Sequence, residues 1–105
     1  MSKAIRIDKL NLDKHLLIDI RSKERYLTAH IKNSLNLNSE EQILNFIKEN
    51  SKQEYVFCCF TSVGAKQMAQ KIASIVGGEN IYYLDASLLE AKSCGFDIVE
   101  LNIAS

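Results

Sequence analysis

The sequence contains no proline and no tryptophan, and its 105 residues include only four glycines and three cysteines. An odd cysteine count without regular spacing does not fit the disulfide framework of a small secreted domain. We therefore expect free thiols in the reducing cytoplasm. No apolar run approaches the length of a transmembrane helix, and residues 1–15 lack the apolar segment of a signal peptide. These absences predict a cytoplasmic protein.

Neither sign of charge dominates, because 13 Lys and Arg residues balance 13 Asp and Glu residues. Proteins that bind DNA, RNA or anionic membranes by electrostatic attraction usually carry an excess of positive charge. We expect neither a nucleic-acid partner nor a membrane partner. Apolar residues make up 47% of the chain, which at this length suffices for one packed core. Residues 1–105 are therefore predicted to form a single domain.

Short apolar segments alternate with helical patterns along the chain. Strands are expected at residues 4–7, 16–20, 55–59 and 81–84, with a last strand, or a tail lying on the sheet, at 98–103. Helices are expected at residues 22–29, 39–50, from 62–65 to 76, and at 87–94, while 31–37 should be irregular with at most a brief strand. This alternation predicts an α/β fold with a mostly parallel central sheet and helices on both faces. Ligands of such sheets bind beyond the carboxyl ends of the strands.

Two adjacent cysteines, Cys58 and Cys59, stand where the strand at residues 55–59 ends. Side chains alternate along a strand, so one thiol should pack into the core and the other should emerge at the loop. The first amides of the following helix lack intrahelical partners and favour negative charge, which lowers the pKa of a nearby thiol. A thiolate there can attack sulfur in another molecule, and the same amides would hold the anionic persulfide that results. This pattern predicts sulfur or phosphate chemistry at Cys59.

Other roles for these cysteines must be considered. A lone cysteine at a strand end is commonly a small buried hydrophobe, and Cys94 has the same simple explanation. A metal site is not expected, because the pair lacks C-x-x-C spacing and His15 and His30 lie far away in sequence. A redox thiol with Cys58 as its resolving partner is a further alternative, although adjacent cysteines form strained disulfides.

Three segments resemble the signatures of the rhodanese-like family. Residues 17–26 (LIDIRSKERY) and 29–37 (AHIKNSLNL) are similar to the first, in which Asp-x-Arg precedes Glu-x-Tyr and then Gly-His-Ile. Residues 56–65 (VFCCFTSVGA) resemble the second, a strand ending in a cysteine that opens a short loop before a helix. Residues 80–85 (NIYYLD) resemble the third. Together these segments extend over most of the chain, in the family's order.

The resemblance implies a rhodanese-like three-layer sandwich and a sulfurtransferase that works through a cysteine persulfide. It favours Cys59 over Cys58 as the catalytic cysteine, because Met68, Ala69 and Ile72 then fall on positions that are apolar in the family's helix. Substrate-binding amides would come from the loop residues Phe60, Thr61, Ser62, Val63, Gly64 and Ala65. The implied donor is thiosulfate or a persulfide, and the acceptor is cyanide, a thiol or a sulfur-accepting protein. No metal or organic cofactor is implied.

The loop departs from the family's pattern at Gly64, where relatives often carry an arginine. Without that guanidinium, charge-assisted recognition of the thiosulfate dianion is weaker, which favours a protein or low-molecular-weight persulfide as donor. The dual-specificity phosphatases, whose fold is similar, need a longer loop ending in arginine, and Ala65 stands at that position here. A non-catalytic binding or regulatory module on the same fold remains the alternative function.

The remaining signature residues are interpreted as parts of the fold. Asp19 and Arg21 are expected to form an ion pair near a strand end, His30 to be a hydrogen-bonded structural residue, and Tyr26 to pack a helix.

Overall fold

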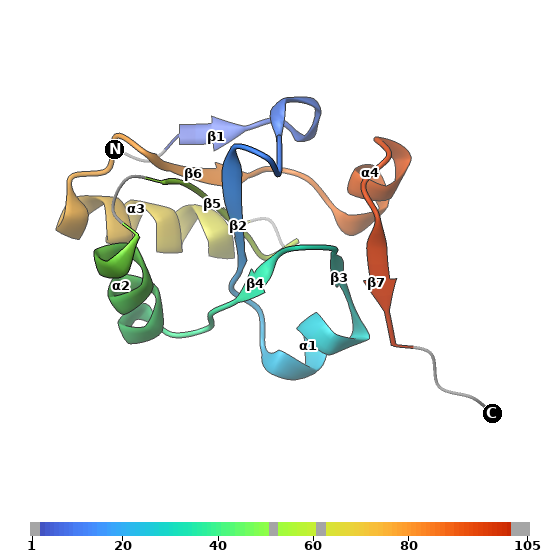
Figure 1. The fold of residues 1–105 in the computed structure, drawn as a ribbon, viewed down its shortest axis with the longest axis horizontal. Helices are drawn as coiled ribbons and strands as arrows, with labels where there is room; N and C mark the ends of the chain where they lie inside the picture. The colour runs from blue at the N-terminus through green and yellow to red at the C-terminus, as the bar shows by residue number, and fades with distance from the viewer. Residues whose placement is uncertain (1–2, 51–52, 61–62, 102–105) are drawn as a thin grey trace.

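The computed structural model describes residues 3–50, 53–60 and 63–101. The strands are β1 (Lys3–Ile5), β2 (His15–Asp19), β3 (Ala29–Ile31), β4 (Leu35–Asn36), β5 (Glu54–Cys58), β6 (Ile81–Leu84) and β7 (Ile98–Glu100). The helices are α1 (Lys23–Thr28), α2 (Glu40–Glu49), α3 (Gly64–Val76) and α4 (Leu88–Ser93), with a short 3-10 helix, η1 (Ile7–Lys9), after β1 (Figure 1). Within these ranges, no helix has the length and apolar character needed to cross a bilayer.

Five strands form the central sheet in the order β1-β6-β5-β2-β4, and every neighbouring pair is parallel. This confirms the α/β fold with a parallel central sheet. β5 lies between β2 and β6, with Asp19 of β2 opposite Cys58 of β5. The Ile20 N–H donates to the Cys58 carbonyl at 3.0 Å, so the two strands end together. The residues that follow β2 and β5 therefore leave the sheet at the same edge.

Two apolar clusters cover the two faces of the sheet, as the three-layer prediction requires. α2 and α3 lie on one side of it and α4 on the other (Figure 1). The first cluster joins α2 and α3 to Phe57 and Cys59, and the second joins α4 to Val56 and Cys58. This alternation along β5 decides which helices each of the two cysteines meets.

Local signals set the helix ends close to their expected positions. The Ser39 hydroxyl caps α2 by accepting the Gln42 N–H, and the Gln42 side chain accepts the N–H of Asn38, one residue before the usual capping-box partner. Gly77, at φ 95°, ends α3 in the left-handed conformation that glycine adopts readily. Val76, in the last turn of α3, is 40% exposed.

Of the two arrangements expected for the C-terminal segment, the structure shows the strand and not the tail lying on the sheet. β7 pairs antiparallel with β3 in a separate two-stranded sheet, so residues 98–100 form a strand and do not lie as a tail on the central sheet. The end of the predicted segment, residues 102–103, lies outside the described ranges. Pairing with β7 also explains why Ala29, expected to end a helix, begins β3.

Tyr26 and His30 act as a structural pair, as their signature positions predict. Their rings stack with centroids 3.8 Å apart, and His30 Nδ1 lies 2.6 Å from the Tyr26 carbonyl. The Tyr26 hydroxyl donates to the Ser34 carbonyl at 2.5 Å. These contacts fasten α1 to the segment that follows β3, so His30 is a fold residue.

His15, at the opposite end of β2 from the cysteines, should make stability depend on pH. Its Nδ1 accepts the Asn11 N–H at 3.0 Å, and its Nε2 lies 3.9 Å from a Glu54 oxygen. Burial lowers the pKa of His15, Glu54 partly opposes this, and Lys14 lowers the pKa further. Because the unfolded chain then binds the proton more tightly, stability is highest above the unfolded pKa of about 6.5 and decreases as the pH falls toward the folded value.

We therefore expect the midpoint temperature of thermal unfolding to decrease as the pH is lowered from about 7 to about 5. The decrease should be less steep in His15→Gln. Differential scanning calorimetry across this range measures both slopes. Equal slopes in the two proteins would show that His15 does not contribute to the pH dependence.

Candidate functional site

Cys59 is the first residue after β5, and its side chain enters the cluster beneath α2 and α3. The Ala65 N–H donates to Cys59 Sγ at 3.0 Å. α3 begins after Val63, whose apolar side chain provides no capping hydrogen bond. A capping side chain normally accepts the N–H of the second or third helical residue, and Ala65 is the second residue of α3. The cysteine sulfur therefore takes the place that a helix-capping oxygen would occupy.

Cys59 is more enclosed than its expected place at a loop suggests, because only 5% of the residue is exposed. Its side chain turns toward α2 and α3, and the helices cover it. The expectation that this thiol emerges at the loop is wrong in that respect. The expectation that the two thiols face opposite ways is correct, since Cys58 belongs to the cluster on the other face.

Cys58 lies in an environment that keeps its thiol protonated. It is 1% exposed, and burial raises the pKa of Cys58 well above its usual value. The neighbouring Asp19 carboxylate raises that pKa further, while Arg21 partly opposes both effects. A protonated thiol is a poor nucleophile, so Cys58 is the weaker candidate of the two for sulfur chemistry.

The structure describes four of the six expected loop residues. Ala65 contacts Cys59 through its amide, Gly64 begins α3, and Val63 is exposed at the helix start. Phe60 has a left-handed backbone, at φ 59°, and its side chain packs on the α4 side of the sheet. Thr61 and Ser62, the other two, lie outside the described residues.

The predicted Asp19–Arg21 ion pair lies next to this loop. The Asp19 side chain is fully buried, and its carboxylate accepts hydrogen bonds from both Nε and Nη2 of Arg21. The distance from Nη2 to Oδ2 is 2.8 Å. Arg21 Nη2 also donates to the Ala29 carbonyl at 2.5 Å. The guanidinium carbon lies 4.9 Å from the centroid of the Phe60 ring, within the range of a cation–π contact. Sequence reasoning found the ion pair and missed its contact with Phe60.

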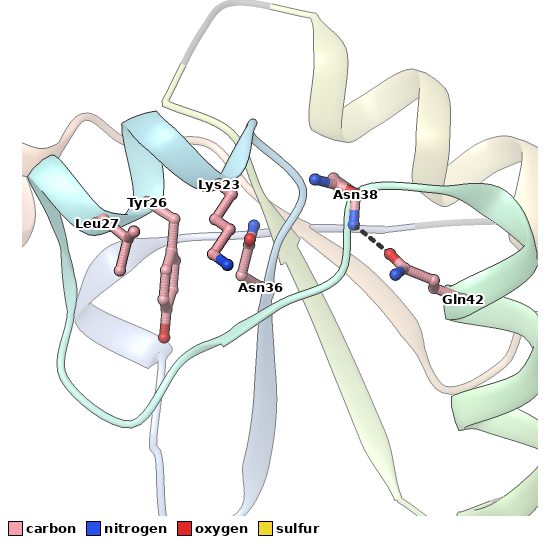
Figure 2. Close-up of a pocket in the computed structure, with 6 residues that line it drawn as sticks. All are labelled: Lys23, Tyr26, Leu27, Asn36, Asn38 and Gln42. Atoms are coloured by element: carbon pink, nitrogen blue, oxygen red, sulfur yellow. Dashed lines mark hydrogen bonds between the residues drawn. The ribbon is translucent and has the colours of Figure 1, made fainter.

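Two cavities that the sequence did not indicate open around α1. One, of about 330 Å³, lies between α1, β4 and the start of α2 (Figure 2), and its lining residues are Lys23, Tyr26, Leu27, Asn36, Asn38 and Gln42. The other, of about 410 Å³, is lined by Arg21, Glu24, Arg25, Thr28, Ala29 and Leu88. Arg21 connects the second cavity to Phe60 and so to the cysteine loop.

The chain is thus an α/β protein with a parallel sheet, in which a cysteine begins the loop between a central strand and the next helix. Residues 5–94 match the family described as the rhodanese-like domain, and the chain belongs to that family. No curated protein matches the sequence.

Solved structures show the same fold at low sequence identity. The solution NMR structure of protein hp1203 from Helicobacter pylori has a TM-score of 0.81 at 21% identity, covering 92% of this chain and 88% of that one. The rhodanese-like domain of an Anabaena protein has a TM-score of 0.76 at 15% identity, covering 100% and 93%. The single-domain sulfurtransferase RDL2 of Saccharomyces cerevisiae has a TM-score of 0.62 at 23% identity, covering 90% and 92%.

Proposed function

We propose that the protein is a sulfurtransferase that carries a sulfane sulfur on Cys59. The observation that supports this most directly is the Ala65 N–H, which donates to Cys59 Sγ from the first turn of α3. Membership in the rhodanese-like family adds support, as does the fold shared with a protein described as a single-domain sulfurtransferase. An amide that already donates to the sulfur can stabilise negative charge there, both on a thiolate and on a persulfide.

The proposed reaction has two half-reactions in which sulfur moves without net oxidation. The Cys59 thiolate attacks the outer sulfur of the donor, a new S–S bond forms, and the donor S–S bond breaks. A persulfide donor leaves as its thiolate, which takes up a proton from water, and thiosulfate leaves as sulfite. In the second half-reaction, cyanide or a thiolate attacks the outer sulfur and the Cys59 thiolate is regenerated. Cyanide leaves as thiocyanate, and a thiol leaves as its persulfide.

The chain's own contribution to these steps is to orient the sulfur and hold the charge. The amides from Phe60 to Ala65 are proposed to surround the persulfide, and the Ala65 N–H already donates to Cys59 Sγ, which becomes its inner sulfur. Enclosure of Cys59 by α2 and α3 excludes water, which strengthens each such hydrogen bond.

Gly64 leads us to expect a preference among donors. With glycine at the place where relatives often carry arginine, a doubly charged donor lacks a bidentate partner. Protein carrying Cys94→Ser, which removes an exposed thiol that would itself react, should gain the mass of one sulfur atom from glutathione persulfide, seen by intact mass spectrometry. Loading from thiosulfate should be about tenfold slower, and cyanide should remove the added mass. Equal loading from both donors would contradict this preference.

The rival function is a non-catalytic binding or regulatory module, which the small exposure of Cys59 favours. The donor screen separates the two functions. If neither donor adds sulfur to a remaining cysteine of the Cys94→Ser protein, the binding-module hypothesis replaces the enzyme hypothesis.

A further inference from the structure

Phe60 adopts a backbone conformation that a bulky side chain rarely takes. Its φ of 59° is in the left-handed region, which costs free energy for any residue with a Cβ atom, and glycine or asparagine is more usual there. Such a residue persists only when its surroundings hold it, and outliers of this kind cluster at functional sites. Phe60 directly follows Cys59, so its conformation sets the direction in which the chain leaves the cysteine.

The group in contact with the Phe60 ring is itself fixed in place. Asp19 is fully buried and holds the Arg21 guanidinium through two nitrogens, and the Ala29 carbonyl accepts a further hydrogen bond from it. Only 11% of the Arg21 side chain is exposed. A guanidinium so constrained provides a fixed cationic surface for an aromatic ring.

The ring and the cysteine sulfur lie on opposite faces of the sheet. Cys59 packs beneath α2 and α3, whereas Phe60 packs on the side of α4 and η1. Opposite faces for consecutive residues continue the alternation of β5, and the left-handed φ of Phe60 then turns the chain away from the extended path of the strand. An anchor on the Phe60 side therefore constrains the Cys59 side chain, whose sulfur must remain within reach of the Ala65 N–H.

We propose that Arg21 and Phe60 are positioning residues for Cys59. This inference takes from the proposed function only that Cys59 is the reacting residue. The cation–π contact holds Phe60 in its left-handed conformation and thereby keeps Cys59 Sγ at the Ala65 amide. Without the aromatic face, the turn relaxes and the sulfur leaves that amide. A reacting atom displaced by a fraction of an ångström to one ångström loses rate even when the protein remains folded.

Substitutions at Phe60 that separate aromatic character from apolar bulk test this role. Phe60→Tyr keeps the ring, whereas Phe60→Leu keeps apolar volume without a π face. Phe60→Met provides a second non-aromatic variant if Phe60→Leu does not fold. Every protein carries Cys94→Ser, because Cys94 is an exposed thiol that would otherwise react with the donor.

Two measurements are made on each variant. The first is the ¹H–¹⁵N chemical shift of the Ala65 amide, with Cys59→Ala giving its value without sulfur. The second is the single-turnover rate of sulfur loading at saturating glutathione persulfide. Phe60→Tyr should retain the parent amide shift and a rate within about twofold, whereas Phe60→Leu should move the shift toward that of Cys59→Ala and load about three- to tenfold more slowly. Thermal midpoints should differ little among them.

The outcomes keep this proposal distinct from the proposed function. If the parent accepts no sulfur but the amide shifts follow the expected order, the positioning role stands and the sulfurtransferase function fails. If the parent accepts sulfur and the Tyr and Leu variants give the same shift and rate, the positioning role is overturned alone. A loss of rate in Phe60→Leu with the Ala65 shift unchanged also overturns it.

Discussion

In protein that already carries Cys94→Ser, Cys59→Ser should abolish sulfur loading, and Cys58→Ser should not. A hydroxyl at position 59 can still accept the Ala65 N–H, so the change preserves the local hydrogen bond while removing the nucleophile. Serine is not ionised at neutral pH, and its hydroxyl is a far weaker nucleophile toward sulfur than a cysteine thiolate. We expect a loss of at least about a thousandfold in the loading rate, read as the absence of a one-sulfur mass gain.

Cys58→Ser is the matched control, because it makes the same chemical change one residue away. Cys58 is buried on the opposite face with a raised pKa, so its thiol should carry no sulfur in the wild-type protein. The variant should lose some stability, since it buries a hydroxyl among apolar side chains, and still gain one sulfur. A sulfur adduct on Cys59→Ser together with none on Cys58→Ser would move the assignment to Cys58.

The parts of this structure that short sequence patterns determine were predicted well. β6 occupies residues 81–84 as expected, because an apolar β-branched and aromatic run follows Gly77 and Gly78 and is bounded by polar residues. Ser39 fixes the start of α2 through a hydrogen bond to a residue three positions away, and Gly77 fixes the end of α3 through its own left-handed conformation. Each of these signals is complete within the segment that it specifies.

What the sequence did not reveal depends on contacts between distant segments. β3 exists because β7, nearly seventy positions away, pairs with it. The enclosure of Cys59 depends on how α2 and α3 meet above it. The contact of Arg21 with Phe60 depends on the register that sets Asp19 opposite Cys58. The sequence pattern of a strand specifies which residues face each side of the sheet. It does not specify which residue of the neighbouring strand pairs with each of them, or how a helix packs over the end of the strand.

Removal of the Asp19 carboxylate should destabilise the protein more than any other change considered for this edge of the sheet. In Asp19→Ala the Arg21 guanidinium stays nearly buried without its counter-ion, and the Arg21 backbone N–H loses its acceptor, Asp19 Oδ1. Breaking a buried ion pair by removing one partner typically costs about 3–5 kcal/mol of unfolding free energy. Urea unfolding at neutral pH, with linear extrapolation to water, measures this loss.

Two further variants show whether the loss comes from an unpaired charge. Asp19→Leu combined with Arg21→Met replaces the pair by apolar groups and should recover part of the stability lost in Asp19→Ala, because no buried charge remains uncompensated. Asp8→Ala breaks the exposed Arg6–Asp8 pair, whose nitrogen and oxygen lie 3.3 Å apart, and should change stability very little. Equal losses in Asp8→Ala and Asp19→Ala would mean that Asp19 contributes no more than a surface charge. The Arg21 guanidinium would then not be held firmly enough to fix the Phe60 ring beside Cys59.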